Sequence, residues 1–149
     1  MNRMIPSGGV KKRMIIWREA LSVGVDLIDT EHQELIRKLN DFMEACTKQS
    51  GKDKILETLS FLKNYTVEHF TDEERLMQEV EYPDYPVHKQ IHDGFVNKVE
   101  EIESSVLEKG PSVLSTIKLN RLLVDWLINH ITKTDVHIGE YIKNREAAS

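Results

Sequence analysis

Four stretches of the chain carry apolar residues at the three- and four-residue spacing of an amphipathic helix, and no stretch shows the alternating pattern of a β-strand. The apolar stripes fall within residues 35–46, 55–77, 88–106 and 119–138. An amphipathic helix must bury its apolar face against another element. Because short links join the four stretches, the sequence predicts an all-α fold, an antiparallel four-helix bundle with up-down-up-down order.

Local signals predict where the first two helices begin and end. Thr30 and Gln33 match a capping box, which predicts that the first helix begins after Thr30. Ser50-Gly51 would end this helix. Asp53 is the predicted N-cap residue of the second helix, because its carboxylate can accept a hydrogen bond from a free backbone N–H.

Prolines and glycines predict the remaining boundaries. The segment 81–86 contains two prolines and would end the second helix, with Pro86 in the first turn of the third. Gly110-Pro111 would end the third helix, and Ser112 can cap the fourth. We expect the fourth helix to run on through Ile138.

Length and patterning predict one domain with an extension. A chain of 149 residues is long enough to bury a core of its own, and we assign residues 14–149 to a single domain. Residues 1–13 are rich in Gly, Lys and Arg and lack apolar periodicity, which predicts a flexible N-terminal extension. Residues 14–28 are predicted to form an N-terminal arm that covers one end of the core with Trp17, Leu21 and Val25.

Composition excludes several classes of partner. The chain is 30% charged with a formal net charge of −5, which gives no electrostatic reason to expect binding to nucleic acid or to an anionic membrane. No apolar run approaches the roughly 20 residues that a membrane span needs, and the N-terminus lacks the apolar region of a secretory signal. The single cysteine, Cys46, fits a reducing compartment, and we expect a cytoplasmic protein.

Five of the six histidines fall, together with two carboxylates, into one ordered pattern along the four predicted helices. Histidine and carboxylate together are ligands for a transition metal such as iron. Seven such side chains are too many for one tetrahedral zinc ion and suit two metal ions that share bridging ligands. The pattern consists of His32, His69, Glu73, His88, His92, His130 and Asp135.

The direction of the helices supports a shared site. His32 lies near the start of the first predicted helix and His88 near the start of the third, whereas His69 and His130 lie toward the ends of the second and fourth. Antiparallel packing therefore brings all of these residues to the same end of the bundle. Residues four apart share a helix face, so His69 with Glu73, and His88 with His92, can each direct two ligands inward.

His130 and Asp135 fit a regular helix less well. Five residues at about 100° each leave a mismatch of roughly 140° between the two side chains. Either the helix is locally overwound or carries a π-bulge, as functional sites often do, or Asp135 reaches around the rim. His137, two residues further on, is predicted to lie at the surface. A single histidine on an apolar face is more often a core residue than a ligand, but five converging with two acids favour metal binding.

In these residues the chain resembles the hemerythrin family, specifically the bacterial hemerythrins. The resemblance covers residues from about 14 to 145 and includes all seven positions of the pattern, in order. The matching residues are Trp17, Gly24, Asp29, His32, His69-Phe70, Glu73-Glu74, Tyr82-Pro83, His88, His92, Trp126-Leu127, His130 and Asp135.

The resemblance implies roles for individual residues. His88, His92 and His130 would bind one non-haem iron ion, and His32 and His69 the other. Glu73 and Asp135 would bridge the two ions, with an oxo or hydroxo group as a third bridge. The open position on the two-histidine iron would take dioxygen. Phe70, Trp126 and Leu127 would line the oxygen pocket, although periodicity alone favours plain core packing for them. Glu74 is predicted to be solvated.

The function implied by the resemblance is reversible dioxygen binding, without catalysis, for oxygen storage, transport or delivery. Two alternatives remain open. One is an oxygen or redox sensor that acts through a partner protein, and the other is a diiron oxidase, peroxidase or nitric oxide scavenger. Apart from dioxygen, the partner that we expect is an unidentified protein recipient or signalling partner.

Overall fold

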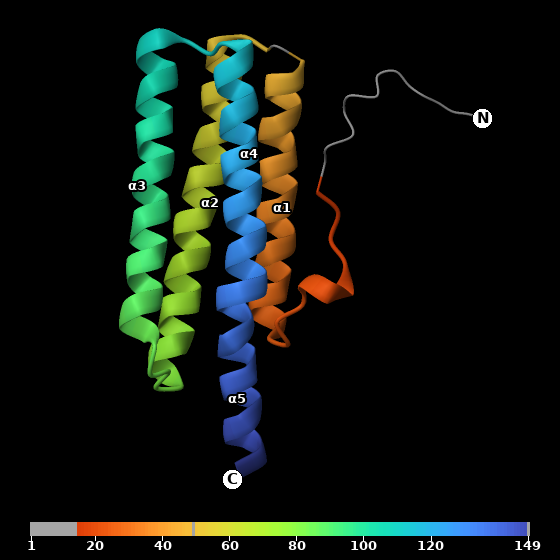
Figure 1. Ribbon diagram of the computed structural model, residues 1–149, viewed down its shortest axis with the longest axis vertical. Helices are drawn as coiled ribbons and strands as arrows, with labels where there is room; N and C mark the ends of the chain where they lie inside the picture. The colour runs from red at the N-terminus through yellow and green to blue at the C-terminus, as the bar shows by residue number, and fades with distance from the viewer. Residues whose placement is uncertain (1–14, 49, 149) are drawn as a thin grey trace, which may run out of the picture.

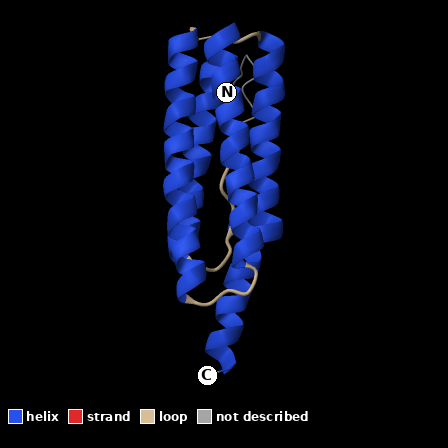
Figure 2. Ribbon diagram, turned by 90° about the vertical axis from the view of Figure 1, so that its left-hand side faces the viewer, coloured by secondary structure: helices blue, strands red, loops and turns tan. Residues whose placement is uncertain are grey.

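Four long helices run antiparallel to one another in the computed structural model, which describes residues 15–48 and 50–148 (Figure 1). In these residues all regular structure is helical (Figure 2), which confirms the predicted all-α, up-down-up-down bundle. The predicted extension, residues 1–13, lies outside the described residues. The helices are α1 (Asp26–Thr47), α2 (Lys52–Glu79), α3 (Tyr85–Lys109), α4 (Val113–His130) and α5 (Val136–Ala148), with a π-helical segment (Ile131–Asp135) between the last two.

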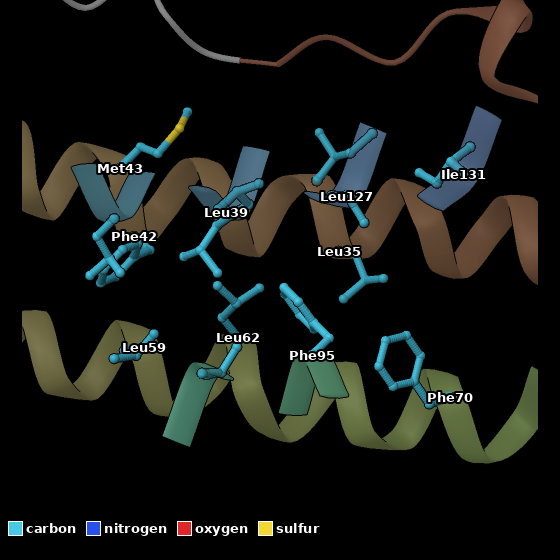
Figure 3. Close-up of a cluster of buried hydrophobic side chains, with 14 of the residues drawn as sticks. Leu35, Leu39, Phe42, Met43, Leu59, Leu62, Phe70, Phe95, Leu127 and Ile131 are labelled. Carbon is cyan, nitrogen blue, oxygen red and sulfur yellow. The ribbon is translucent and has the colours of Figure 1, made fainter. Parts of the chain in front are cut away.

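The core lies between the helices and follows the predicted apolar stripes. In Figure 3, Leu35, Leu39 and Phe42 of α1 face the side chains of α2 across the bundle axis. Leu39 is 1% exposed and Phe42 is fully buried. Cys46 also lies in this core, where burial raises the pKa of its thiol to about 11. It therefore remains a neutral thiol at physiological pH.

The predicted start of the first helix is wrong. α1 begins at Asp26, so Thr30 lies inside the helix and is exposed rather than being a cap. The reason is a contact with the preceding arm that the capping pattern at Thr30 does not report. The carboxylate of Asp29 accepts hydrogen bonds from the backbone N–H of Val23 (2.8 Å) and from Ser22 Oγ (2.5 Å), which ties the arm to the first turn of α1.

Between the end of α1 and the start of α4, the predicted boundaries agree with the structure except at Asp53. Gly51, not Asp53, is the N-cap residue of α2. Asp53 lies in the first turn, where the negative charge of a carboxylate interacts favourably with the helix dipole. Pro86 lies in the first turn of α3, as predicted. Gly110 ends α3 with a φ of 76°, a conformation that glycine adopts at little cost. Ser112 directly precedes α4.

The N-terminal arm runs beside α1 before entering it (Figure 1). The backbone N–H of Ile15 donates to Asn40 Oδ1 (3.0 Å), and Asn40 Nδ2 donates back to the carbonyl of Ile15 (2.9 Å). Trp17, Leu21 and Val25 pack against the core, as predicted. The arm ends at Val25 rather than at residue 28, because α1 starts earlier than expected.

A close approach between the arm and α5 gives the first testable prediction. A Cβ atom added to Gly139 would lie 1.7 Å from the carbonyl oxygen of Val23, so Gly139→Ala must displace the backbone of the arm. We expect a loss of about 1–3 kcal/mol in the free energy of unfolding, typical of overpacking, measured by urea denaturation. Gly94→Ala in α3 is the matched control, because its added Cβ meets nothing within 4 Å and alanine favours a helix. Equal behaviour of the two variants would contradict the prediction.

Candidate metal centre

The structure brings all seven residues of the histidine and carboxylate pattern together at one end of the bundle. This is the end at which α1 and α3 begin and α2 and α4 finish (Figure 1). Each of the seven side chains is buried, with Asp135 fully enclosed and His130 the most exposed at 4%. Burying this many polar groups costs free energy unless each finds a partner. The cluster therefore requires a chemical explanation.

The seven residues fall into two groups that share their carboxylates. In each group, one ligand atom from every residue lies within 4.8 Å of all the others. Two groups with common carboxylates are the arrangement that a pair of bridged metal ions needs. The first group is His88, His92, His130, Glu73 and Asp135, and the second is His32, His69, Glu73 and Asp135.

The three imidazoles of the first group converge on a common point. His130 Nε2 lies 3.2 Å from the Nε2 atoms of both His88 and His92. Two nitrogens bound to one metal ion at about 2.1 Å, with angles of about 90–110°, are about 3.0–3.4 Å apart. The observed separations therefore match a set of ligands around a single ion.

Asp135 directs one oxygen toward each group. Its Oδ1 atom lies 2.9 Å from Nε2 of His130 and 3.0 Å from Nε2 of His88, in the three-histidine group. Its Oδ2 atom accepts a hydrogen bond from Nε2 of His32 at 2.8 Å, in the two-histidine group. A carboxylate divided in this way can bind two ions at once.

Glu73 divides its oxygens in the same manner. Oε1 lies 3.0 Å from Nε2 of His88 and 2.9 Å from Nε2 of His92, whereas Oε2 lies 3.5 Å from Nε2 of His69. Neither oxygen makes a hydrogen bond, and Asp135 Oδ1 and His69 Nε2 are also buried without one. Unsatisfied buried polar atoms are uncommon and costly in proteins. Coordination to metal ions would satisfy all four atoms, so the residues present fit such ions.

The π-helical segment explains how Asp135 enters the cluster. In a π-helix each backbone N–H pairs with the carbonyl five residues earlier, and residues five apart lie much nearer to one face than they do in an α-helix. His130 directly precedes the segment and Asp135 ends it, which places both side chains on the same face. Of the two arrangements considered from the sequence, the structure shows the bulged helix. The predicted continuous helix through Ile138 is therefore interrupted between α4 and α5.

The residues of the cluster also shift one another's pKa values. Burial and the neighbouring Asp135 would raise the pKa of Glu73, but the surrounding imidazoles hold it well below its usual range. Burial would lower the pKa of His130, but Asp135 and Glu73 raise it to about 9. The protons on the imidazoles thus compensate the carboxylates, a role that divalent cations would take over. Metal binding should therefore release protons.

Two glutamates outside the pattern contact its histidines. Nδ1 of His69 donates to Glu31 Oε1 at 2.7 Å, and Nδ1 of His92 donates to Glu74 Oε2 at 2.8 Å. The prediction that Glu74 is solvated is wrong, and Glu31 was not identified from the sequence. Metal-binding imidazoles commonly donate their second N–H to a carboxylate. Acidic residues next to predicted ligands are therefore the signal that could have found both.

Aromatic side chains stack on two histidines of the three-histidine group. The ring of Phe70 stacks on that of His92 with centroids 3.7 Å apart, and Trp126 stacks on His130 at 4.4 Å. Phe70, Trp126 and Leu127 also line a narrow apolar cavity of about 10 Å³ between the helices. This volume is near the minimum that holds one water molecule. The three residues predicted to line a pocket thus share one cavity.

His137 behaves as predicted. Its side chain is 59% exposed and pairs with Glu140 on the surface of α5, 3.0 Å away. It takes no part in the buried cluster.

Among the described residues, no helix combines the length and the apolar character that crossing a membrane requires.

Comparison with known proteins identifies several relatives. The family model described as "Hemerythrin HHE cation binding domain" matches residues 23–142. A bacteriohemerythrin of Stenotrophomonas maltophilia (strain R551-3) is 31% identical over 130 residues, covering 87% of this chain and 82% of the relative. A myohemerythrin of Theromyzon tessulatum is 33% identical over 121 residues, covering 80% and 86%. A solved structure of wild-type hemerythrin superposes with a TM-score of 0.76 at 27% identity, covering 85% of this chain and 96% of that one.

Proposed function

The chain belongs to the hemerythrin family, and we propose that it binds dioxygen reversibly at a non-haem diiron site, as a non-enzymatic protein of oxygen storage, transport or delivery. One observation carries the proposal. Glu73 and Asp135 each direct one oxygen toward the three-histidine group and the other toward the two-histidine group. This is the arrangement expected of two carboxylates that bridge a pair of metal ions.

We assign the ligands accordingly. His88, His92 and His130 would hold one iron, His32 and His69 would hold the other, and the two carboxylates would bridge them with an oxo or hydroxo group. A ferrous pair bound here would supply the two electrons and the open coordination position that dioxygen binding requires. Five neutral imidazoles against two carboxylates make a less anionic site than the four-glutamate, two-histidine set of ferritin-like diiron proteins. This composition favours the ferrous state and reversibility.

The apolar surroundings support binding of a small ligand. Phe70, Trp126 and Leu127 line the oxygen pocket in this proposal, and the cavity that they share admits little more than one small molecule. Such a lining excludes water and protons from the site, which limits irreversible oxidation.

Cycling the protein between anaerobic and aerobic conditions tests the proposal. The protein is loaded with two equivalents of ferrous iron without oxygen, air is admitted, and oxygen is then removed under argon. A carrier should gain and lose the same ultraviolet–visible absorption change over repeated cycles. Prompt and permanent conversion to the ferric form would reject the carrier function and favour a redox sensor that acts through a partner protein, or an enzyme.

The assignment of ligands gives a second prediction. His69→Ala removes one of the two histidines assigned to the second iron, so we expect one tightly bound iron per chain and no reversible absorption change. Iron content is measured by elemental analysis after gel filtration. His137→Ala is the matched control, because this histidine is exposed and takes no part in the cluster, and the variant should retain two irons. Intact oxygen binding in His69→Ala would show that the assignment is wrong.

A further inference from the structure

We infer that Glu31 and Glu74 are positioning residues, each of which holds one histidine of the cluster with Nε2 directed at the metal. The two glutamates serve different groups: Glu31 contacts His69 of the two-histidine group, and Glu74 contacts His92 of the three-histidine group. The inference rests on the proposed diiron site and adds a role for two residues that lie outside its ligand set.

Glu31 links α1 to α2 at the site. Its Oε1 atom accepts a hydrogen bond of 2.7 Å from Nδ1 of His69, and its side chain is 11% exposed. An ionised carboxylate can only accept, so an imidazole that binds a metal ion in its neutral form must carry its hydrogen on Nδ1. The lone pair then lies on Nε2, the atom that faces Glu73 and has no hydrogen-bond partner.

Glu74 performs the same task between α2 and α3. Its Oε2 atom accepts a hydrogen bond of 2.8 Å from Nδ1 of His92, and its side chain is 17% exposed. The ammonium group of Lys89 lies 3.7 Å from the other carboxylate oxygen. Nε2 of His92 is thereby directed toward Glu73 and His130.

Two of the three remaining histidines lack such a partner. Nδ1 of His32 and Nδ1 of His130 are buried without a hydrogen-bond partner. The ring of His130 is instead held by stacking on Trp126, with the two planes 12° apart. One imidazole of each group is therefore oriented by a glutamate, and loss of that glutamate should affect one metal ion and spare the other.

Ferrous iron affinity tests the inference without reference to oxygen. Full-length variants are titrated anaerobically against a chromophoric chelator, and the parent protein should show two binding events. Glu31→Ala and Glu74→Ala should each weaken one event by about 10–100-fold, the usual effect of removing such a partner. Glu31→Gln and Glu74→Gln keep an oxygen that can accept from Nδ1 and should recover most of the affinity. Glu44→Ala and Glu79→Ala at exposed positions of α1 and α2 are the controls and should change neither event.

A double-mutant cycle assigns each glutamate to its ion. In a His69→Ala background, Glu31→Ala should have little further effect on the remaining event, whereas Glu74→Ala should still weaken it. A thermal melt of each metal-free variant checks folding, because a merely structural role would lower the melting temperature and weaken both events together.

Three results would overturn the inference: equal weakening of both events, failure of the glutamine variants to recover affinity, or unchanged affinity in both alanine variants. A parent protein that takes up two ferrous ions but does not bind oxygen reversibly refutes the proposed oxygen function alone, and the affinities still decide the inference. A parent protein that takes up no iron refutes both.

Discussion

Asp135→Ala should abolish the binding of two iron ions per chain. Asp135 directs one oxygen to each group of ligands, so its removal takes a ligand from both ions at once. Even the outer partners of metal ligands change affinity by about 10–100-fold, so we expect a loss of at least about 100-fold for one ion. Anaerobic ferrous titration followed by elemental analysis measures the loss.

Two variants separate the loss of a ligand from damage to the fold. Asp135→Asn keeps the size of the side chain but removes its charge, and it should also fail to retain two irons. Asp125→Ala, at an exposed position of α4, should bind two irons like the parent protein. Circular dichroism of each metal-free variant verifies its helical content. Retention of two tightly bound irons by a folded Asp135→Ala protein would remove the carboxylate bridge from the proposal.

Removal of iron should lower the melting temperature by roughly 10 °C at neutral pH. A ligand that binds only the folded state stabilises it by about 4 kcal/mol when present at 1,000 times its dissociation constant. Each kcal/mol corresponds to about 2–4 °C in a chain of this size. The physical source is the buried cluster, in which both oxygens of Glu73, Oδ1 of Asp135 and Nε2 of His69 have no hydrogen-bond partner without a metal ion. Scanning calorimetry with and without a chelator measures the difference.

The Asp135→Ala variant supplies the control for iron removal, because a protein that binds little iron should melt at nearly the same temperature with and without the chelator. An iron-independent melting temperature in the parent protein would contradict the expectation.

The metal-free protein should also show a defined pH dependence of stability. Against the effect of burial, Asp135 raises the pKa of His130 from 6.5 to about 9, so this contribution is complete below pH 6.5 and is lost as the pH rises through about 9. Also against burial, the imidazoles lower the pKa of Glu73 from 4.5, so its contribution is present above pH 4.5 and is lost at lower pH. Urea unfolding of the metal-free protein should therefore give a maximum between about pH 4.5 and 6.5.

Much of the fold and the identities of the clustered side chains could be predicted from the sequence. Four apolar stripes at helical spacing specify four helices, and the two i,i+4 pairs specify which ligands share a face. The position of each histidine along its helix then follows from antiparallel packing. These properties depend on helix periodicity and chain direction, both of which a linear sequence encodes.

Other features could not be predicted from helix periodicity and capping patterns. The capping signal at Thr30 is genuine as a pattern but is overridden, because Asp29 binds the backbone of the arm and α1 begins a turn earlier. Glu31 and Glu74 look like ordinary surface acids, because their partners lie on neighbouring helices 38 and 18 residues away in the chain. The need for glycine at position 139 follows only from the close approach of α5 to the carbonyl of Val23.

By itself, the sequence determined that this protein is a helical bundle with seven histidine and carboxylate side chains at one end. The tertiary structure alone decided how those side chains are shared. His130 and Asp135 meet because the chain adopts a π-helical segment between them. No residue pattern within the segment predicts this conformation. The division of each carboxylate between two groups depends on distances among four helices. Such distances are set by packing, which is a property of the folded chain and not of any segment of it.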